Sequence, residues 1–175
     1  MLAQTKKSWE IAGRIDMGKS PMKQFEGSEG RLHLIRALAL QPLIHEQNLA
    51  MAVAHQVELE AVPAGANLIQ QGASDTDLFL ILEGAFSIAF DGHVVASVKA
   101  GQHVGEMSVV DPHAPRSATV TATSDSIVAR IAESDFSALA ERFPQLWRRI
   151  ALELAGRLRN EYAGERAREK AGRAA

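Results

Sequence analysis

The sequence predicts an α+β fold in which an antiparallel β-structure lies between helices at both ends of the chain. Apolar residues recur at helical spacing over residues 31–55 and again over 134–162. Residues 57–131 instead form short apolar or alternating runs separated by turns that contain glycine. Closely spaced strands of this kind are typical of a β-barrel or sandwich. A chain of 175 residues is long enough to bury one hydrophobic core.

The helical segments are predicted from one apolar stripe each. The first stripe consists of Leu32, Ile35, Leu38 and Ala39. Gln41-Pro42 interrupts it, and a second short helix is expected over residues 45–55. After the strands, Ser134 is a suitable N-cap for one helix, and Pro144 suits the first turn of the next. The stripe of this last helix is Leu146, Ile150, Leu154 and Leu158.

The strands are predicted from apolar runs and from alternation. Residues 78–82 are a continuous apolar run of strand length, and in residues 85–90 apolar and small polar residues alternate. Asp91-Gly92 then predicts a two-residue hairpin turn, with residues 93–99 as the returning strand. Two further strands are expected over residues 118–122 and 127–131.

Composition excludes several classes of protein. A formal net charge of −2 argues against a general nucleic-acid binder, which needs a basic excess. The absence of cysteine excludes disulfides, iron–sulfur clusters and thiolate zinc sites. The sequence contains no apolar run of the roughly 20 residues that a membrane span requires. Its first ten residues lack the apolar segment of a secretory signal, so we expect a cytoplasmic protein that does not bind membranes.

The residues with the clearest chemistry lie between 101 and 120. Gly105 lets the backbone come close to a ligand, and N–H groups at the start of a helix over residues 105–108 can meet a phosphate oxygen. Arg116 supplies a planar countercharge, and Ser117 adds a small donor beside it. Glu106 supplies a carboxylate that can accept a hydrogen bond from a sugar hydroxyl. These residue types together fit a cyclic phosphate diester joined to a ribose.

This stretch resembles the phosphate-binding cassette of the cyclic nucleotide-binding domain, which occurs in catabolite activator-type regulators, protein kinase regulatory subunits and cyclic nucleotide-gated channels. The matching segments are Gly105-Glu106-Met107 and Pro115-Arg116-Ser117-Ala118-Thr119-Val120. Upstream, residues 69–72 and 78–84 look like the strand–turn–strand segment with which the β-structure of the family begins. The resemblance implies an antiparallel β-roll, a jelly-roll-like barrel, flanked by N-terminal helices and two C-terminal helices.

The resemblance also implies a ligand site. The amides of Gly105, Glu106, Met107 and Ser108 and the side chains of Arg116 and Ser117 would hold the phosphate, and Glu106 would hold the ribose. The remaining residues expected at the site are Ala118 of the cassette and, on the base side, Ile88, Val95 and Val98. The last helix would act as a lid that moves when ligand binds. Two departures are Val104, where the family often has an aromatic residue, and Ser108, where many members have alanine.

The expected ligand is cAMP, because Ser117 after Arg116 resembles cAMP-type pockets, and cGMP stays an open alternative. No catalysis and no cofactor are expected. We expect a partly ordered N-terminal extension over residues 1–30, in which a short helix could begin near Trp9; the alternative is a segment that docks through Trp9 and Phe25. The cyclic nucleotide-binding domain with its lid helix is expected over 31–163, followed by a charged tail over 164–175.

Several alternatives stay open. His93, His103 and His113 could suggest a metal site, but their separation favours solvent-exposed histidines and no metal. The chain could be a fragment or relative of a transcription regulator, although only about 12 residues follow Tyr162, too few for a DNA-reading helix-turn-helix. It could also be a scaffold that has lost its ligand. The output could pass to an unidentified partner protein or through a homodimer along the last helix.

Overall fold

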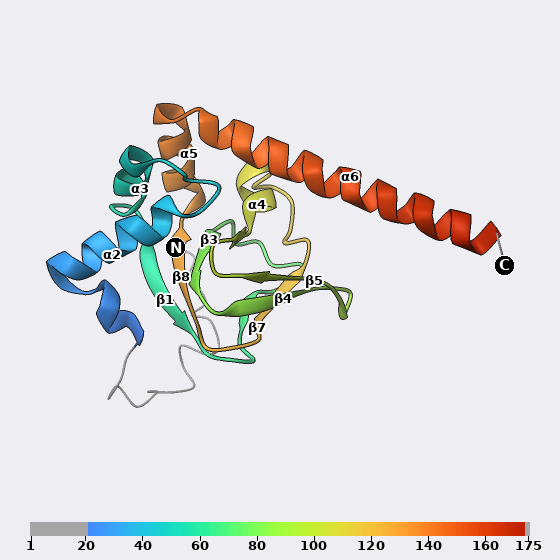
Figure 1. The fold of residues 1–175 in the computed structure, drawn as a ribbon, viewed down its shortest axis with the longest axis horizontal. Coiled ribbons are helices and arrows are strands. Elements are labelled where there is room, and N and C mark those ends of the chain that lie inside the picture. The colour runs from blue at the N-terminus through green and yellow to red at the C-terminus, as the bar shows by residue number, and fades with distance from the viewer. Residues whose placement is uncertain (1–20, 174–175) are drawn as a thin grey trace.

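The computed structural model describes residues 21–173 and shows a β-roll with helices on one side (Figure 1). The N-terminal helical elements are a 3-10 turn η2 (Pro21–Phe25) and helices α2 (Gly27–Ala39) and α3 (Gln47–Val53). The strands are β1 (Glu58–Val62), β2 (Asn67–Ile69), β3 (Leu78–Glu83), β4 (Ala85–Phe90), β5 (His93–Lys99), β6 (His103–Val104), β7 (Thr119–Ala122) and β8 (Ser126–Ile131). The remaining helices are α4 (Glu106–Val110), α5 (Glu133–Arg142) and α6 (Gln145–Arg173).

The strands form two four-stranded antiparallel sheets, ordered β1-β8-β3-β6 and β2-β7-β4-β5. The predicted hairpin between β4 and β5 is confirmed, with β4 pairing to β5 along its length. Its two turn residues, Asp91 and Gly92, have φ values of 48° and 80°. Positive φ at both positions is the requirement of the type I′ turn that joins two twisted strands. The α+β fold with a β-roll between helices is therefore the fold that the sequence predicts.

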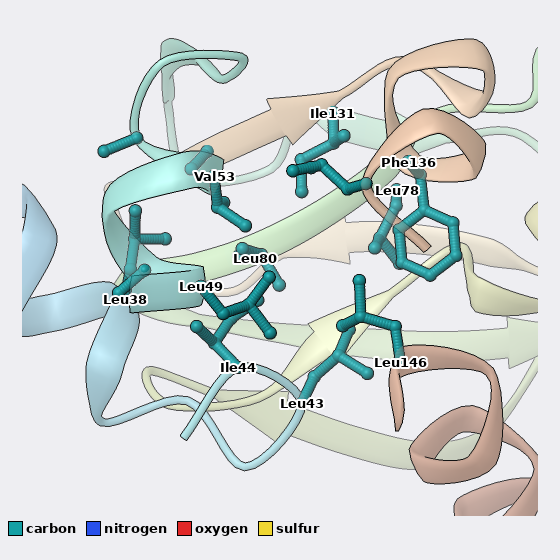
Figure 2. Close-up of a cluster of buried hydrophobic side chains, with 14 of the residues drawn as sticks. Leu38, Leu43, Ile44, Leu49, Val53, Leu78, Leu80, Ile131, Phe136 and Leu146 are labelled. Atoms are coloured by element: carbon teal, nitrogen blue, oxygen red, sulfur yellow. The ribbon is translucent and has the colours of Figure 1, made fainter. Parts of the chain in front are cut away.

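Strand β3 is apolar from Leu78 to Leu82, because both of its faces are buried over these residues. Leu78 and Leu80 point toward the helices and belong to a cluster that also holds side chains from α2, α3, α5 and α6. Figure 2 shows this cluster, in which Leu38, Leu49, Phe136 and Leu146 surround the two leucines. Phe79 and Ile81 point the other way, into the interior of the roll. This strand thus joins the helical core to the β core.

Two helices begin at residues other than those that the sequence predicted. Helix α2 begins at Gly27 rather than near Arg31. Gly30 lies inside this helix, where the Phe25 backbone comes too close to leave room for a Cβ atom. Helix α5 begins at Glu133 with Ala132 at the N-cap position and no side-chain cap, so the predicted N-cap Ser134 is wrong. Acidic Glu133 and Asp135 occupy its first turn instead, where the helix dipole favours negative charge.

Helix α6 runs without interruption to Arg173, through most of the charged tail expected over residues 164–175, and extends well beyond the roll (Figure 1). Its predicted apolar stripe is buried only at its start. Leu146 and Ile150 are buried, whereas 48% of Leu158 is exposed. Within residues 21–173, no helix has both the length and the apolar character needed to cross a membrane. The suggested helix and docking contact near Trp9 lie outside the described residues, whereas Phe25 packs against the helical core.

Candidate functional site

A cavity of about 160 Å³ lies where α4, β7 and α6 meet on the roll. Its wall contains every residue that the sequence predicted for the site except Val95 and Val98. Those present are Ile88, Gly105, Glu106, Met107, Ser108, Arg116, Ser117 and Ala118. Four further residues line the cavity: Ile69, Val104, Val120 and Arg157. Val95 lies on β5 and is 64% exposed, and Val98 is buried inside the roll, so the structure does not bring these two to the cavity.

The Arg116 side chain is buried and fixed from several directions. Its Nε and Nη2 donate to Asp75 Oδ2 at 3.1 and 2.5 Å, and Nη2 also donates to the Asp77 carbonyl oxygen at 2.7 Å. Nη1 donates to Ser108 Oγ at 3.1 Å and lies 3.5 Å from the Gly105 carbonyl oxygen. The guanidinium is therefore fixed beside the turn that begins α4, and Asp75 neutralises its Nε and Nη2 edge.

The backbone places Arg116 beside the loop that precedes β3. The Arg116 N–H donates to the Ala73 carbonyl at 2.8 Å, and the Gly72 N–H donates to the Arg116 carbonyl at 2.9 Å. Asp77 is fixed in turn, since Arg130 Nη1 donates to its carboxylate at 3.0 Å. These contacts join the loop over residues 72–77 to the cassette, so the orientation of Arg116 is set before any ligand arrives.

The turn between β6 and α4 depends on Gly105, which has a φ of +91°. A Cβ atom there would lie 2.5 Å from the Asp77 carbonyl oxygen and 2.9 Å from Arg116 Nη1. Glycine is thus required both by its backbone angle and by the close approach of Arg116. The Ser108 N–H donates back to the Gly105 carbonyl at 3.2 Å. The helix geometry leaves the N–H groups of Glu106 and Met107 without partners inside α4.

Glu106 is the first residue of α4, and only 3% of it is exposed. Its Oε1 pairs with Nη1 of Arg157, which reaches across from α6. Arg157 Nη2 also donates to Glu153 Oε1 at 2.6 Å, one turn back on the same helix. Burial of a carboxylate is costly unless a cation or donors compensate it, and Arg157 supplies that compensation.

His103 is buried, so the expectation of a solvent-exposed histidine at this position is wrong. Its Nε2 lies 3.2 Å from Glu153 Oε2, but in a direction that forms no hydrogen bond. Burial lowers the pKa of His103, and this effect outweighs the opposing influence of Glu153 and Glu106. Within residues 21–173, no group of three or more histidines and acidic residues is arranged to hold a metal ion.

Asp75 and Arg157 belong to this site but were not predicted from the sequence. Asp75 lies 41 residues before Arg116, and Arg157 lies 51 residues after Glu106. The only sequence signals were a polar loop before β3 and several arginines on the last helix. Neither feature identifies which residue points toward the cavity. For Arg157, this depends on how α6 lies across the roll.

Comparison with known proteins agrees with this geometry. Residues 59–143 match the family model of the cyclic nucleotide-binding domain. Among solved structures, the Thermus thermophilus catabolite activator protein superposes with a TM-score of 0.64 at 26% identity, over 71% of this chain and 61% of that one. The regulatory domain of Toxoplasma gondii PKA, crystallised with cAMP, has a TM-score of 0.58 at 26% identity, over 66% and 46% of the two chains. Residues 59–143 therefore belong to the cyclic nucleotide-binding domain family.

Two curated relatives are more similar in sequence. The Pycsar effector protein XpPycTIR of Xanthomonas perforans is 39% identical over 138 residues, which are 78% of this chain and 46% of the relative. The Pycsar effector protein BcPycTIR of Burkholderia cepacia is 41% identical over 152 residues, 85% of this chain and 50% of the relative. The chain thus spans about half the length of these relatives.

Proposed function

We propose that this domain is a regulatory sensor that binds one 3′,5′-cyclic nucleotide, with cAMP as the expected ligand. The observation that carries the proposal is the meeting of buried Arg116 and buried Glu106 at one cavity beside the start of α4. A cyclic phosphate diester carries one negative charge, which suits a guanidinium together with the N–H groups of Glu106 and Met107. The ribose 2′-hydroxyl is a donor, which suits the carboxylate of Glu106.

The hydrogen bonds of the Arg116 guanidinium support phosphate binding at Nη1. Asp75 and the Asp77 carbonyl take the Nε and Nη2 hydrogens, whereas Nη1 has only Ser108 Oγ and a long contact to the Gly105 carbonyl. A phosphate oxygen is a charged acceptor and forms a stronger hydrogen bond with Nη1 than the Ser108 hydroxyl does. The phosphate would therefore replace Ser108 at Nη1 and leave the pairing with Asp75 intact.

The preference for cAMP rests on two supports. Ser117 follows Arg116, as in cAMP-type pockets, and it lines the cavity. The regulatory domain of Toxoplasma gondii PKA, 26% identical to this chain, was crystallised with cAMP. The apolar cavity residues Ile69, Ile88 and Val120 offer a surface on which a base can pack. The roles of Val95 and Val98 at the base stay predictions.

The proposed role is regulatory, without chemistry on the nucleotide and without a cofactor. Its output would pass to a downstream protein in the cytoplasm, and the similarity to Pycsar effector proteins supports a role as the sensing part of an effector. A homodimer through α6 is a second route for the output. The exposed apolar side chains of Leu152, Leu158 and Tyr162 on that helix support it.

Calorimetric titration with cAMP, cGMP, cCMP and cUMP tests the ligand, on protein refolded to remove nucleotide carried over from expression. We expect micromolar or tighter binding of cAMP, about −8 kcal/mol. Replacement of Arg116 by alanine should weaken it at least about 30-fold, because that removes the countercharge from a buried anion. Arg116→Ala leaves Asp75 unpaired, which can unfold the protein. Arg116→Lys keeps the positive charge and is the second variant to measure in that case.

The matched control is Arg148→Ala, which removes the same charge from an exposed position on α6. It should leave the affinity within about twofold of the native value. Equal affinity in the Arg116 and Arg148 variants would contradict the assignment of the phosphate to Arg116. Absence of binding with all four nucleotides would overturn the sensor proposal and favour the scaffold alternative.

A further inference from the structure

The Ser108 side chain is buried in the wall of the cavity, beside the Arg116 guanidinium. Only 4% of Ser108 is exposed, and its Oγ accepts a hydrogen bond from Arg116 Nη1 at 3.1 Å. Its backbone N–H is already used, because it donates to the Gly105 carbonyl at 3.2 Å. The group of Ser108 that is left to meet a ligand is therefore its hydroxyl.

This hydroxyl has a donor that the protein does not use. A serine hydroxyl can accept and donate at the same time, but Ser108 Oγ only accepts. Among residues 21–173, the structure gives the Ser108 hydroxyl no acceptor for its own hydrogen. A buried donor without an acceptor costs free energy, so an acceptor that enters the cavity beside it is favoured.

A phosphate bound at Arg116 would bring such an acceptor. When a phosphate oxygen replaces Ser108 Oγ at Arg116 Nη1, the hydroxyl loses the one hydrogen bond that it has in this structure. The short serine side chain turns about a single bond, so its hydroxyl stays close to Nη1 and to the phosphate oxygen bound there. A phosphate oxygen carries negative charge and is a strong acceptor for an O–H donor.

We propose that the Ser108 hydroxyl donates to one exocyclic oxygen of the bound phosphate, so that Ser108 accepts from Arg116 before the ligand binds and donates to the ligand afterwards. This inference rests on the proposed function, because the acceptor is the phosphate of the nucleotide. The two exocyclic oxygens lie on different sides of the cyclic diester. One hydroxyl meets only one of them, so Ser108 makes the site distinguish between the two oxygens.

The affinity for cAMP alone does not test this contact, because Ser108→Ala changes the protein both with and without ligand. The variant takes an acceptor from Arg116 before binding and a donor from the phosphate afterwards, and these two changes affect the affinity in opposite directions. A comparison of two ligands on the same variant cancels the first change, since both ligands start from the same unbound protein. Sulfur in place of one exocyclic oxygen gives the second ligand, because sulfur is a weak acceptor.

The experiment is a competition titration of cAMP and its two phosphorothioate diastereomers, or of those of the tightest binder among the four nucleotides. In the native protein we expect one diastereomer to bind more weakly than the other. Ser108→Ala should reduce the loss of affinity of that diastereomer about three- to tenfold, the scale of one hydrogen bond, and leave the other unchanged. Ser108→Cys keeps nearly the same shape with a weak donor, and it should give the same result if the alanine variant fails to fold.

The matched control is Ser126→Ala. Ser126 is also 4% exposed, but its hydroxyl donates to the Ser124 carbonyl at 2.8 Å and it does not line the cavity. This variant should leave the losses of affinity of both diastereomers as they are in the native protein. The same change in the Ser126 and Ser108 variants would overturn the proposal, because the effect would then not be specific to the cavity.

The remaining outcomes separate this proposal from the proposed function. If cAMP binds and the Ser108 variants change neither diastereomer, or change both equally, the contact with one oxygen is overturned and the sensor function stands. Failure of every nucleotide to bind the native protein overturns both proposals.

Discussion

His103 is buried, although its position in the sequence suggested a solvent-exposed histidine. It lies on the short strand β6, and the groups facing it are Glu153 and Arg157 of α6 and Glu106 of α4. Burial keeps the ring neutral in the folded protein by lowering its pKa below the ordinary 6.5. The unfolded chain therefore binds a proton at a higher pH than the folded chain does.

This difference predicts that stability falls on acidification. Well above pH 6.5 His103 is neutral in both states and contributes no pH dependence. Below it the unfolded state takes up a proton first, so the free energy of unfolding decreases by up to about 1.4 kcal/mol per pH unit until the folded pKa is reached. Urea unfolding between pH 7 and 5 should show a smaller loss for His103→Asn than for the native protein. His93→Asn, at an exposed position, serves as control, and equal losses in all three proteins would contradict this role of His103.

At the scale of single residues, the sequence predicted those site residues that lie close together along the chain. Glu106 and Arg116 were found because the cassette is a continuous stretch in which the residue types define the chemistry. Asp75, Arg157 and the burial of His103 were not found, because each depends on a contact across 41 or more residues. For Ser108 only the backbone amide was expected at the phosphate, and the structure shows that its hydroxyl also accepts a hydrogen bond from Arg116.

Among the elements, the turn from β6 into α4 depends most strictly on one residue type, a glycine at position 105. Gly105→Ala should lower the free energy of unfolding by about 2–4 kcal/mol, because it adds a clash with the Asp77 carbonyl to the strain of a positive φ. Gly101 has a similar φ of +87°, but no atom lies within 4 Å of the place that a Cβ would take there. Gly101→Ala should therefore cost only about 1 kcal/mol.

Urea unfolding of the two variants, side by side, measures the difference. We expect a clearly larger loss at Gly105, together with loss of nucleotide binding, because Arg116 would also be pushed aside. If both glycines cost the same, the close approach of Arg116 and Asp77 to Gly105 would not contribute to stability.

The elements were predictable where a local pattern determines them. The Asp91-Gly92 turn determined the β4–β5 hairpin, and the apolar run over residues 78–82 indicated the strand β3. The start of α5 was misplaced because Ser134 is a good N-cap by type, whereas the observed N-cap, Ala132, lies two residues earlier. The stripe of α6 indicated a helix but not the point at which burial ends, since that depends on the edge of the roll.

Across the whole molecule, two cores meet at β3 and leave the cavity at the junction of the roll, α4 and α6. The order of strands in the two sheets pairs segments that are distant in sequence, such as β1 with β8, and no local pattern specifies it. The same arrangement places the long helix against the cassette. This helix extends well beyond the roll (Figure 1).

Nucleotide binding at the cassette is tested most directly by a ¹H–¹⁵N correlation spectrum of the labelled protein during titration with cAMP, with 5′-AMP as control. We expect saturable shifts at the amides of Gly105, Glu106 and Met107 and at Arg116 Nε, and much weaker effects from the linear nucleotide. A cyclic phosphate fixed to the ribose can reach Arg116 and Glu106 together, whereas a flexible and more highly charged monoester cannot do so as well. Shifts confined to other surfaces, such as the groove beside Met51 and His55, with the cassette unchanged, would contradict binding at this site.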